Sequence, residues 1–159
     1  MIRISVLLVL ALLPAYANAA SCGVTATPVA FGAYTSPGGS QVDSTGTIRV
    51  TCTPDLILLA CSASYSIGLS TGGSGSYATR RMISGAHNLN YNLYTDSSYG
   101  TVWGDGVSAP AVPATITTSI LGLVCLPGSR NTTVYGRTPG NQNVGLGSYS
   151  DTITVTVTF

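Results

Sequence analysis

The stretch that decides the fold is S-D-T-I-T-V-T-V-T-F, residues 150–159. Within it, apolar side chains alternate with threonines at every step. The apolar set is Ile153, Val155, Val157 and Phe159, and the hydroxyl set is Thr152, Thr154, Thr156 and Thr158. Because successive side chains of a strand point to opposite faces, this period of two predicts a β-strand with one apolar face. A strand this apolar has to be paired, since an uncovered edge invites aggregation.

The composition of the 159-residue chain indicates a β-rich protein with many turns. The chain contains 19 glycines and nine tyrosines, and it has no lysine and no glutamate. Charged residues make up 7% of the sequence, against about 25% in an average domain. This length suits one domain with its own core. The formal net charge of +1 argues against nucleic-acid binding, which needs a basic surface.

The first 19 residues are expected to be a signal peptide. Arg3 supplies the positive n-region, residues 6–13 form an apolar core, and A-N-A at residues 17–19 fits a cleavage site. The apolar run is shorter than the roughly 20 residues that span a membrane. We therefore expect export, cleavage after residue 19, and a single domain of residues 20–159 without an integral membrane segment.

Four cysteines follow this leader: Cys22, Cys52, Cys61 and Cys125. An even number of cysteines in an exported chain indicates disulfides. Three connectivities are possible, and we prefer Cys22–Cys52 together with Cys61–Cys125. A zinc site is the alternative, but the sequence has no C-x2-C pair and His87 is its one histidine.

Several other segments show short apolar alternation between turn-forming clusters, and none carries helical periodicity over three turns. This pattern predicts an all-β fold, an antiparallel sandwich. Pro28 interrupts the first of these segments, which indicates an edge strand or a switch between sheets. The expected strands before the final one cover residues 24–31, 46–53, 65–70, 89–94, 102–103, 115–126 and 133–137.

The sequence offers little catalytic chemistry. His87 lies in the turn-like stretch S-G-A-H-N, and no serine sits in a nucleophile elbow. The five aspartates are scattered beside Gly, Ser or Pro, a pattern typical of turn capping. No lysine follows the glycine-rich residues 71–76, so they do not form a phosphate-binding loop. We expect a protein that is not an enzyme, with no catalytic residue, metal or cofactor.

Three local features bear on surfaces and on the core. An apolar run after the second cysteine is interpreted as buried chain or as an exposed contact loop. Trp103 is expected to fill the core rather than to hold a ligand. The basic pair Arg80-Arg81 is expected on a solvated strand edge. The apolar run consists of Leu56, Ile57, Leu58 and Leu59.

Seven stretches, taken in order, resemble the spore coat protein U domain, which occurs in subunits of archaic chaperone–usher pili. Each stretch is weakly specific by itself, but together they cover most of the chain after the leader. They are C-G-V-T-A-T-P-V-A-F-G-A-Y from Cys22, S-T-G-T-I-R-V-T-C ending at Cys52, Y-S-I-G-L-S-T-G-G-S-G-S-Y from Tyr65, L-N-Y-N-L-Y-T-D from Leu89, V-W-G-D-G from Val102, V-Y-G-R from Val134 and G-S-Y-S-D-T-I-T-V-T-V-T-F ending at Phe159.

The resemblance implies an immunoglobulin-like sandwich that lacks its final strand. A periplasmic pilus chaperone would lend the missing strand, and a neighbouring pilin subunit, assembled at an outer-membrane usher, would later replace it. It also implies that the last strand borders the acceptor groove. The residues that would then line the groove or contact the chaperone are Ile153, Val155, Val157 and Phe159.

A polymerising member of this family carries a donor segment before its first cysteine-bearing strand. Only Ala20 and Ser21 would precede Cys22 after cleavage, so we expect a domain that accepts a strand and donates none. The expected function is an exported structural or adhesive pilin-like subunit that passes through the periplasm to the cell surface and supports attachment or biofilm. The alternatives are a cell- or spore-coat protein without a pilus, and a carbohydrate-binding module that uses Trp103 and exposed tyrosines.

Overall fold

The computed structural model describes residues 21–53, 61–117, 120–121 and 124–159. Within these residues the chain forms ten β-strands and one 3-10 turn, η1 (Gly72–Ser74). The strands make a five-stranded sheet, a three-stranded sheet and a two-stranded hairpin. The all-β prediction is therefore confirmed.

The larger sheet has the strand order β1-β2-β9-β5-β4, and every neighbouring pair in it is antiparallel. Its two central members, β2 and β9, pair continuously from Val42↔Thr138 to Cys52↔Gly128. This long ladder lies inside the larger sheet, between β1 on one side and β5 on the other. The strands of this sheet are β1 (Ser21–Thr27), β2 (Val42–Thr53), β4 (Arg80–Ser84), β5 (His87–Tyr94) and β9 (Gly128–Thr138).

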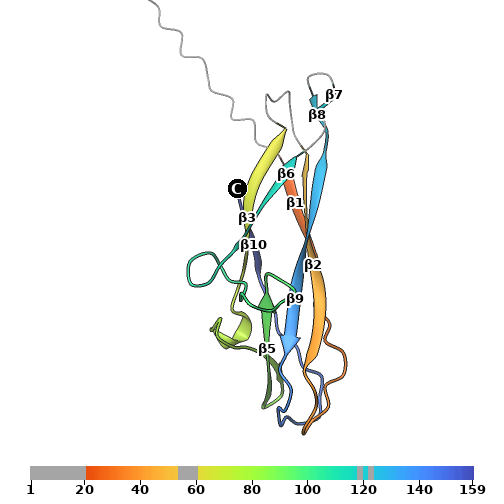
Figure 1. Ribbon diagram of the computed structural model, residues 1–159, viewed down its shortest axis with the longest axis vertical. Coiled ribbons are helices and arrows are strands. Elements are labelled where there is room, and N and C mark those ends of the chain that lie inside the picture. The colour runs from red at the N-terminus through yellow and green to blue at the C-terminus, as the bar shows by residue number, and fades with distance from the viewer. Residues whose placement is uncertain (1–20, 54–60, 118–119, 122–123) are drawn as a thin grey trace, which may run out of the picture.

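The smaller sheet has the order β10-β3-β6 and is also antiparallel. It consists of β3 (Ser62–Leu69), β6 (Val112–Thr117) and β10 (Val155–Thr158). The hairpin of β7 (Ile120–Leu121) and β8 (Val124–Cys125) lies at one end of the long axis, as Figure 1 shows. The two sheets pack as the layers of a sandwich.

The core lies between the two sheets and is filled by alternate residues of their strands. On β2 the side chains of Ile48 and Val50 are buried, and on β3 those of Tyr65 and Ile67 are buried. Trp103 is 0% exposed, and its indole Nε1 donates a hydrogen bond to the carbonyl oxygen of Ile67 at 2.8 Å. The expected core role of Trp103 is confirmed.

Two disulfides fasten the sandwich. Cys22–Cys52 joins β1 to β2, where the two cysteines are direct partners in the register. Cys61–Cys125 joins the residue before β3 to the end of β8. This is the connectivity that the sequence analysis preferred. The two sequence separations are 30 and 64 residues, and in the chain-entropy model loops of this size contribute about 3–4 kcal/mol each.

Several predicted strands differ from the observed ones. Residues 102–103 contribute only an isolated bridge, the expected strand over 115–126 overlaps β6, β7 and β8, and β4 was not predicted. The first strand ends at Thr27, because Pro28 cannot donate to a ladder, and Val29 and Phe31 pack against the core outside any strand. The last strand, β10, covers only Val155–Thr158 of the expected residues 150–159. The predicted alternation nevertheless extends across residues 151–158, where odd positions are partly buried and even positions are exposed.

The expectation that Arg80 lies on a solvated edge is wrong, because Arg80 is 0% exposed. The alternation along β4 turns Arg80 into the core and leaves Arg81 in solvent. The Arg80 guanidinium donates to the carbonyl oxygens of Ser70 and Trp103 and to Oδ1 of Asn92, over 2.7–3.0 Å. Burial lowers the pKa of Arg80 from its usual value. The planar guanidinium group thus connects β4 by hydrogen bonds to β5, to the chain after β3 and to the backbone of Trp103.

Replacing Arg80 tests this arrangement. We expect Arg80→Lys to lower the free energy of unfolding by about 2–4 kcal/mol, because a compact ammonium cannot serve the same acceptors as a planar fork. Urea unfolding of the purified chain measures the loss. Arg81→Lys, one residue along on the solvent face, is the matched control and should change stability by less than about 0.5 kcal/mol. Equal midpoints for both variants would contradict the assigned role.

Candidate functional site

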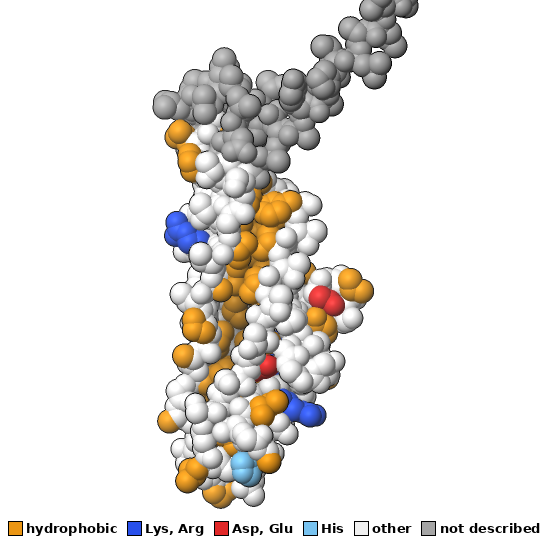
Figure 2. All heavy atoms as spheres, turned by 180° about the vertical axis from the view of Figure 1, so that it is seen from behind, with side chains coloured by type: hydrophobic (Ala, Val, Ile, Leu, Met, Phe, Trp, Pro, Cys, Tyr) orange, Lys and Arg blue, Asp and Glu red, His pale blue; other side chains and the backbone are white. Residues whose placement is uncertain are grey.

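The sandwich is open along one side, where the edge strands of its two sheets face each other. β1 is the edge of the larger sheet and β10 is the edge of the smaller sheet. Between them runs a groove with a volume of about 450 Å³ that reaches the core. Figure 2 shows this side as a stripe of apolar side chains along the long axis, bordered by polar surface.

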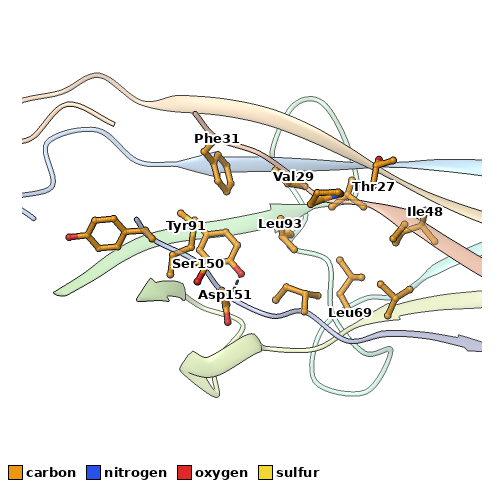
Figure 3. A pocket seen from close by; sticks show the side chains of 16 residues that line it. Thr27, Val29, Phe31, Ile48, Leu69, Tyr91, Leu93, Ser150 and Asp151 are labelled. Carbon is orange, nitrogen blue, oxygen red and sulfur yellow. Dashed lines mark hydrogen bonds between the residues drawn. The ribbon is translucent and has the colours of Figure 1, made fainter. Parts of the chain in front are cut away.

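One wall of the groove is formed by the chain from β1 to Phe31. After Pro28, the side chains of Val29 and Phe31 lie over two glycines of the larger sheet, Gly46 and Gly136. A Cβ atom at Gly136 would lie 2.5 Å from Cγ1 of Val29 and 2.8 Å from Cζ of Phe31. Because these two glycines have no side chain, Val29 and Phe31 can pack directly against the larger sheet. Figure 3 shows Thr27, Val29 and Phe31 following one another along this wall.

The opposite wall is the chain that leads into β10. Ile153 and Val155 are partly buried and line the groove. Val157 packs against the same core beyond the groove lining. Phe159 is 64% exposed, and its ring lies 5.7 Å from that of Tyr65. The structure thus brings the four predicted residues onto one side of the chain, but only the first two line the groove.

The floor of the groove comes from both sheets. Ile48 on β2, Leu69 on β3 and Leu93 on β5 are buried and contribute to it. Figure 3 shows these three side chains pointing into the space between the sheets. A side chain that entered the groove would therefore meet aliphatic carbon from both layers.

One end of the groove is polar. The hydroxyl of Tyr91 donates to Oδ2 of Asp151 at 2.7 Å, and the backbone N–H of Gly73 donates to Oδ1 at 2.9 Å. Burial, followed by the neighbouring Asp151 carboxylate, raises the pKa of Tyr91, so Tyr91 stays a neutral donor. This contact fixes the segment before β10 to η1 and to β5. The sequence analysis did not predict this contact. Asp151 lies two residues before Ile153, so both side chains point to the same face of this segment, and Asp151 is the one charged residue on that apolar face.

The edges that flank the groove differ from the other two sheet edges. In the described part of the chain, β1 pairs only with β2, and β10 pairs only with β3. Neither strand carries a proline or a charged residue. The edge of β4 is paired at one position, by two backbone hydrogen bonds between Ile83 and Ser150, and β6 contains Pro113. Proline and covering chain segments are common protections against edge pairing. Among the described residues neither lies within β1 or β10, although Pro28 directly follows β1.

Other predicted features fall outside this site. Leu56, Ile57, Leu58 and Leu59 lie outside the described residues, so their role as a contact loop stays a prediction. Over residues 21–53, 61–117, 120–121 and 124–159, no group of three His, Cys, Asp or Glu side chains is placed to hold a metal ion. No helix in this same part of the chain is long and apolar enough to span a membrane.

The sandwich and its open groove place the molecule among pilin-like immunoglobulin folds. In a solved structure, a chain of the CsuC–CsuE chaperone–tip adhesion subunit pre-assembly complex from archaic chaperone-usher Csu pili of Acinetobacter baumannii has a similar fold. The TM-score is 0.56 at 22% identity, over 89% of this chain and 40% of that chain. At this identity the likeness shows a shared fold.

The chain belongs to the Spore Coat Protein U domain family, whose family model matches residues 9–156. It is also similar to Protein U of Myxococcus xanthus, with 33% identity over 126 residues. That match covers 76% of this chain and 63% of Protein U. The chain therefore spans less than two thirds of the length of this relative.

The glycines under the Val29–Phe31 wall give a direct test of the groove geometry. We expect Gly136→Val to lower the free energy of unfolding by about 1–3 kcal/mol, because the new side chain collides with both Val29 and Phe31. Gly23→Val on β1 is the control, since no atom lies within 4 Å of a Cβ built there. Urea unfolding compares the two variants. A Gly136→Val midpoint equal to that of the control would show that the wall does not rest on this glycine.

Proposed function

We propose that this chain is a pilin-like structural subunit whose groove accepts one extended strand from another polypeptide. The observation that carries the proposal is the pair of unprotected edges, β1 and β10, on the two sides of an apolar groove. Main-chain hydrogen bonds to such an edge supply affinity, while alternate side chains of the added strand enter the groove. The groove offers the chemistry of strand complementation rather than that of catalysis.

The lining of the groove defines the strand that fits it. Every second residue of an added strand would point into the groove, because side chains alternate along a strand. Those residues should be apolar, since they would contact Ile153, Val155 and the floor of the groove. Burial of apolar surface between the added strand and the groove would stabilise the complex by about 25 cal/mol per Å². Asp151, engaged by Tyr91 and Gly73, marks the polar end of the groove.

We further propose that a periplasmic pilus chaperone provides the first strand and that a neighbouring subunit replaces it at an outer-membrane usher. Membership of the Spore Coat Protein U domain family supports this pathway. The leader of residues 1–19 would direct export through the periplasm to the cell surface. There the subunit would serve attachment or biofilm, either as part of a fibre or at its end.

A coat protein without a pilus is the second candidate, and the 33% identity to Protein U of Myxococcus xanthus favours it. The two candidates differ in what fills the groove, because a coat protein has no need of a chaperone strand. In the carbohydrate-binding alternative Trp103 cannot contact a ligand, since that side chain is fully buried.

Co-expression with a periplasmic pilus chaperone, followed by affinity purification, tests the strand-acceptor proposal. We expect a stable complex with the unmodified chain and no complex with Val155→Asp, because the carboxylate would be buried in the groove without a partner. Thr156→Asp carries the same charge one residue along, where the side chain is exposed, and should still be captured.

Two outcomes would sink the proposal. One is the equal capture of Val155→Asp and Thr156→Asp. The other is purification of the unmodified chain as a stable monomer that no chaperone captures, which would favour the coat protein.

A further inference from the structure

A second cavity lies on the opposite face of β10, away from the groove. Its volume is about 710 Å³, and its floor includes Thr154, Thr156 and Gly68. One of its walls contains Asp105 and Ser108, and another contains Ser76 and Tyr77. We refer to this cavity as the outer cleft. Figure 1 shows the loop before β6, which carries Asp105, standing out from the sandwich on the same side as η1.

Most of the residues that line the outer cleft carry a hydroxyl group. Thr154 and Thr156 reach it because the alternation along residues 151–158 sends their side chains outward. A hydroxyl both donates and accepts hydrogen bonds. The lining also has one carboxylate, Asp105, and one aromatic ring, Tyr77. A ligand that suits this set carries many hydroxyls of its own and some apolar surface for a ring.

The charges at the outer cleft exclude anionic ligands and divalent cations. Its lining contains no Arg, Lys or His, so it has no cation to attract a phosphate or another anion. Arg80 lies behind the cleft, with its guanidinium over the Tyr77 ring at 5.2 Å, but it is fully buried and engaged by four hydrogen bonds. A single carboxylate is too few oxygen ligands for a divalent cation. Among the classes that are left, the hydroxyl-bearing residues of the lining favour an uncharged ligand with hydroxyls of its own.

The loop wall of the outer cleft is held in a fixed shape. Oδ1 of Asp105 accepts hydrogen bonds from the backbone N–H groups of Val107 and Ser108, at 2.9 and 2.8 Å. These backbone hydrogen bonds lower the pKa of Asp105, so it is ionised and acts as an acceptor at neutral pH. The N–H of Gly104 also donates to the carbonyl oxygen of Pro110 at 2.7 Å.

The aromatic wall is fixed as well. The Tyr77 hydroxyl donates to the carbonyl oxygen of Leu69 at 3.0 Å, and the Arg80 guanidinium covers one face of the ring. Burial, and then the neighbouring Asp105 carboxylate, raises the pKa of Tyr77, so the phenol stays protonated. Walls that are already ordered lose little entropy when a ligand binds.

From these features we infer that the outer cleft binds an uncharged saccharide. Sugar hydroxyls would pair with Thr154, Thr156 and the Asp105 carboxylate, and the apolar face of a sugar ring would lie against Tyr77. Thr154 and Thr156 point away from the side on which Ile153 and Val155 line the groove. A strand in the groove therefore leaves the outer cleft open, and the subunit can hold both at once.

Binding to an array of neutral and acidic glycans tests the inference, with the strongest neutral oligosaccharide then titrated in solution. The variant is Thr156→Val, which removes one hydroxyl of the cleft floor and keeps the shape of the side chain. Loss of one hydrogen bond should weaken binding about five- to tenfold. Thr158→Val is the matched control, because Thr158 is exposed on the same face of β10 but does not line the cleft. It should bind as the unmodified chain does.

A second variant, Asp105→Asn, tests the loop wall of the outer cleft independently of the cleft floor. Asparagine can still accept the backbone N–H groups of the loop, so the wall keeps its shape while the charge is lost. We expect at least a tenfold loss of binding, since hydrogen bonds to a charged acceptor are the stronger ones. Absence of binding to any neutral glycan, binding of acidic glycans alone, or equal affinity of Thr156→Val and Thr158→Val would each overturn the inference. None of these results depends on strand capture by the groove.

Discussion

The structure depends on a backbone constraint: each N–H and C=O group along a strand needs a partner. β2, β3, β5 and β9 find partners on both sides, whereas the edge strands β1, β4, β6 and β10 each pair with a strand on one side only. The edges of β1 and β10 lie opposite each other, and the apolar groove between them opens onto the core. A further strand seated in the groove would satisfy the free backbone groups of these two edges.

Several interactions hold the opening in shape from within. The Arg80 guanidinium reaches carbonyl oxygens on two segments and the Asn92 amide, which keeps β4 and β5 fixed to the chain that follows β3. The Tyr91–Asp151 contact positions the chain just before β10. Gly136 makes room for the Val29–Phe31 wall. In each case a polar or small residue fixes the position of a chain segment that apolar packing alone would not determine.

The sequence was sufficient for the architecture and for the orientation of its last strand. Alternation over residues 151–158 separated the groove side from the outer side correctly, because a period of two needs no tertiary information. The core role of Trp103 followed from its size. The position of Arg80 could not be predicted this way, since its burial depends on carbonyl oxygens that come from distant parts of the chain. The outer cleft was not predicted either, because it forms between a loop, a 3-10 turn and a strand face that meet only in the folded chain.

The position of the Cys22–Cys52 disulfide has a mechanical consequence. A strand seated beside β1 and pulled along its length would load the hydrogen bonds between β1 and β2 next. Those bonds could then break one after another from the free end of the edge strand. The disulfide lies near the first residue of β1 and opposite the end of β2, so at that end tension passes through a covalent link. An edge anchored in this way resists peeling, which is the property that a load-bearing fibre joint requires.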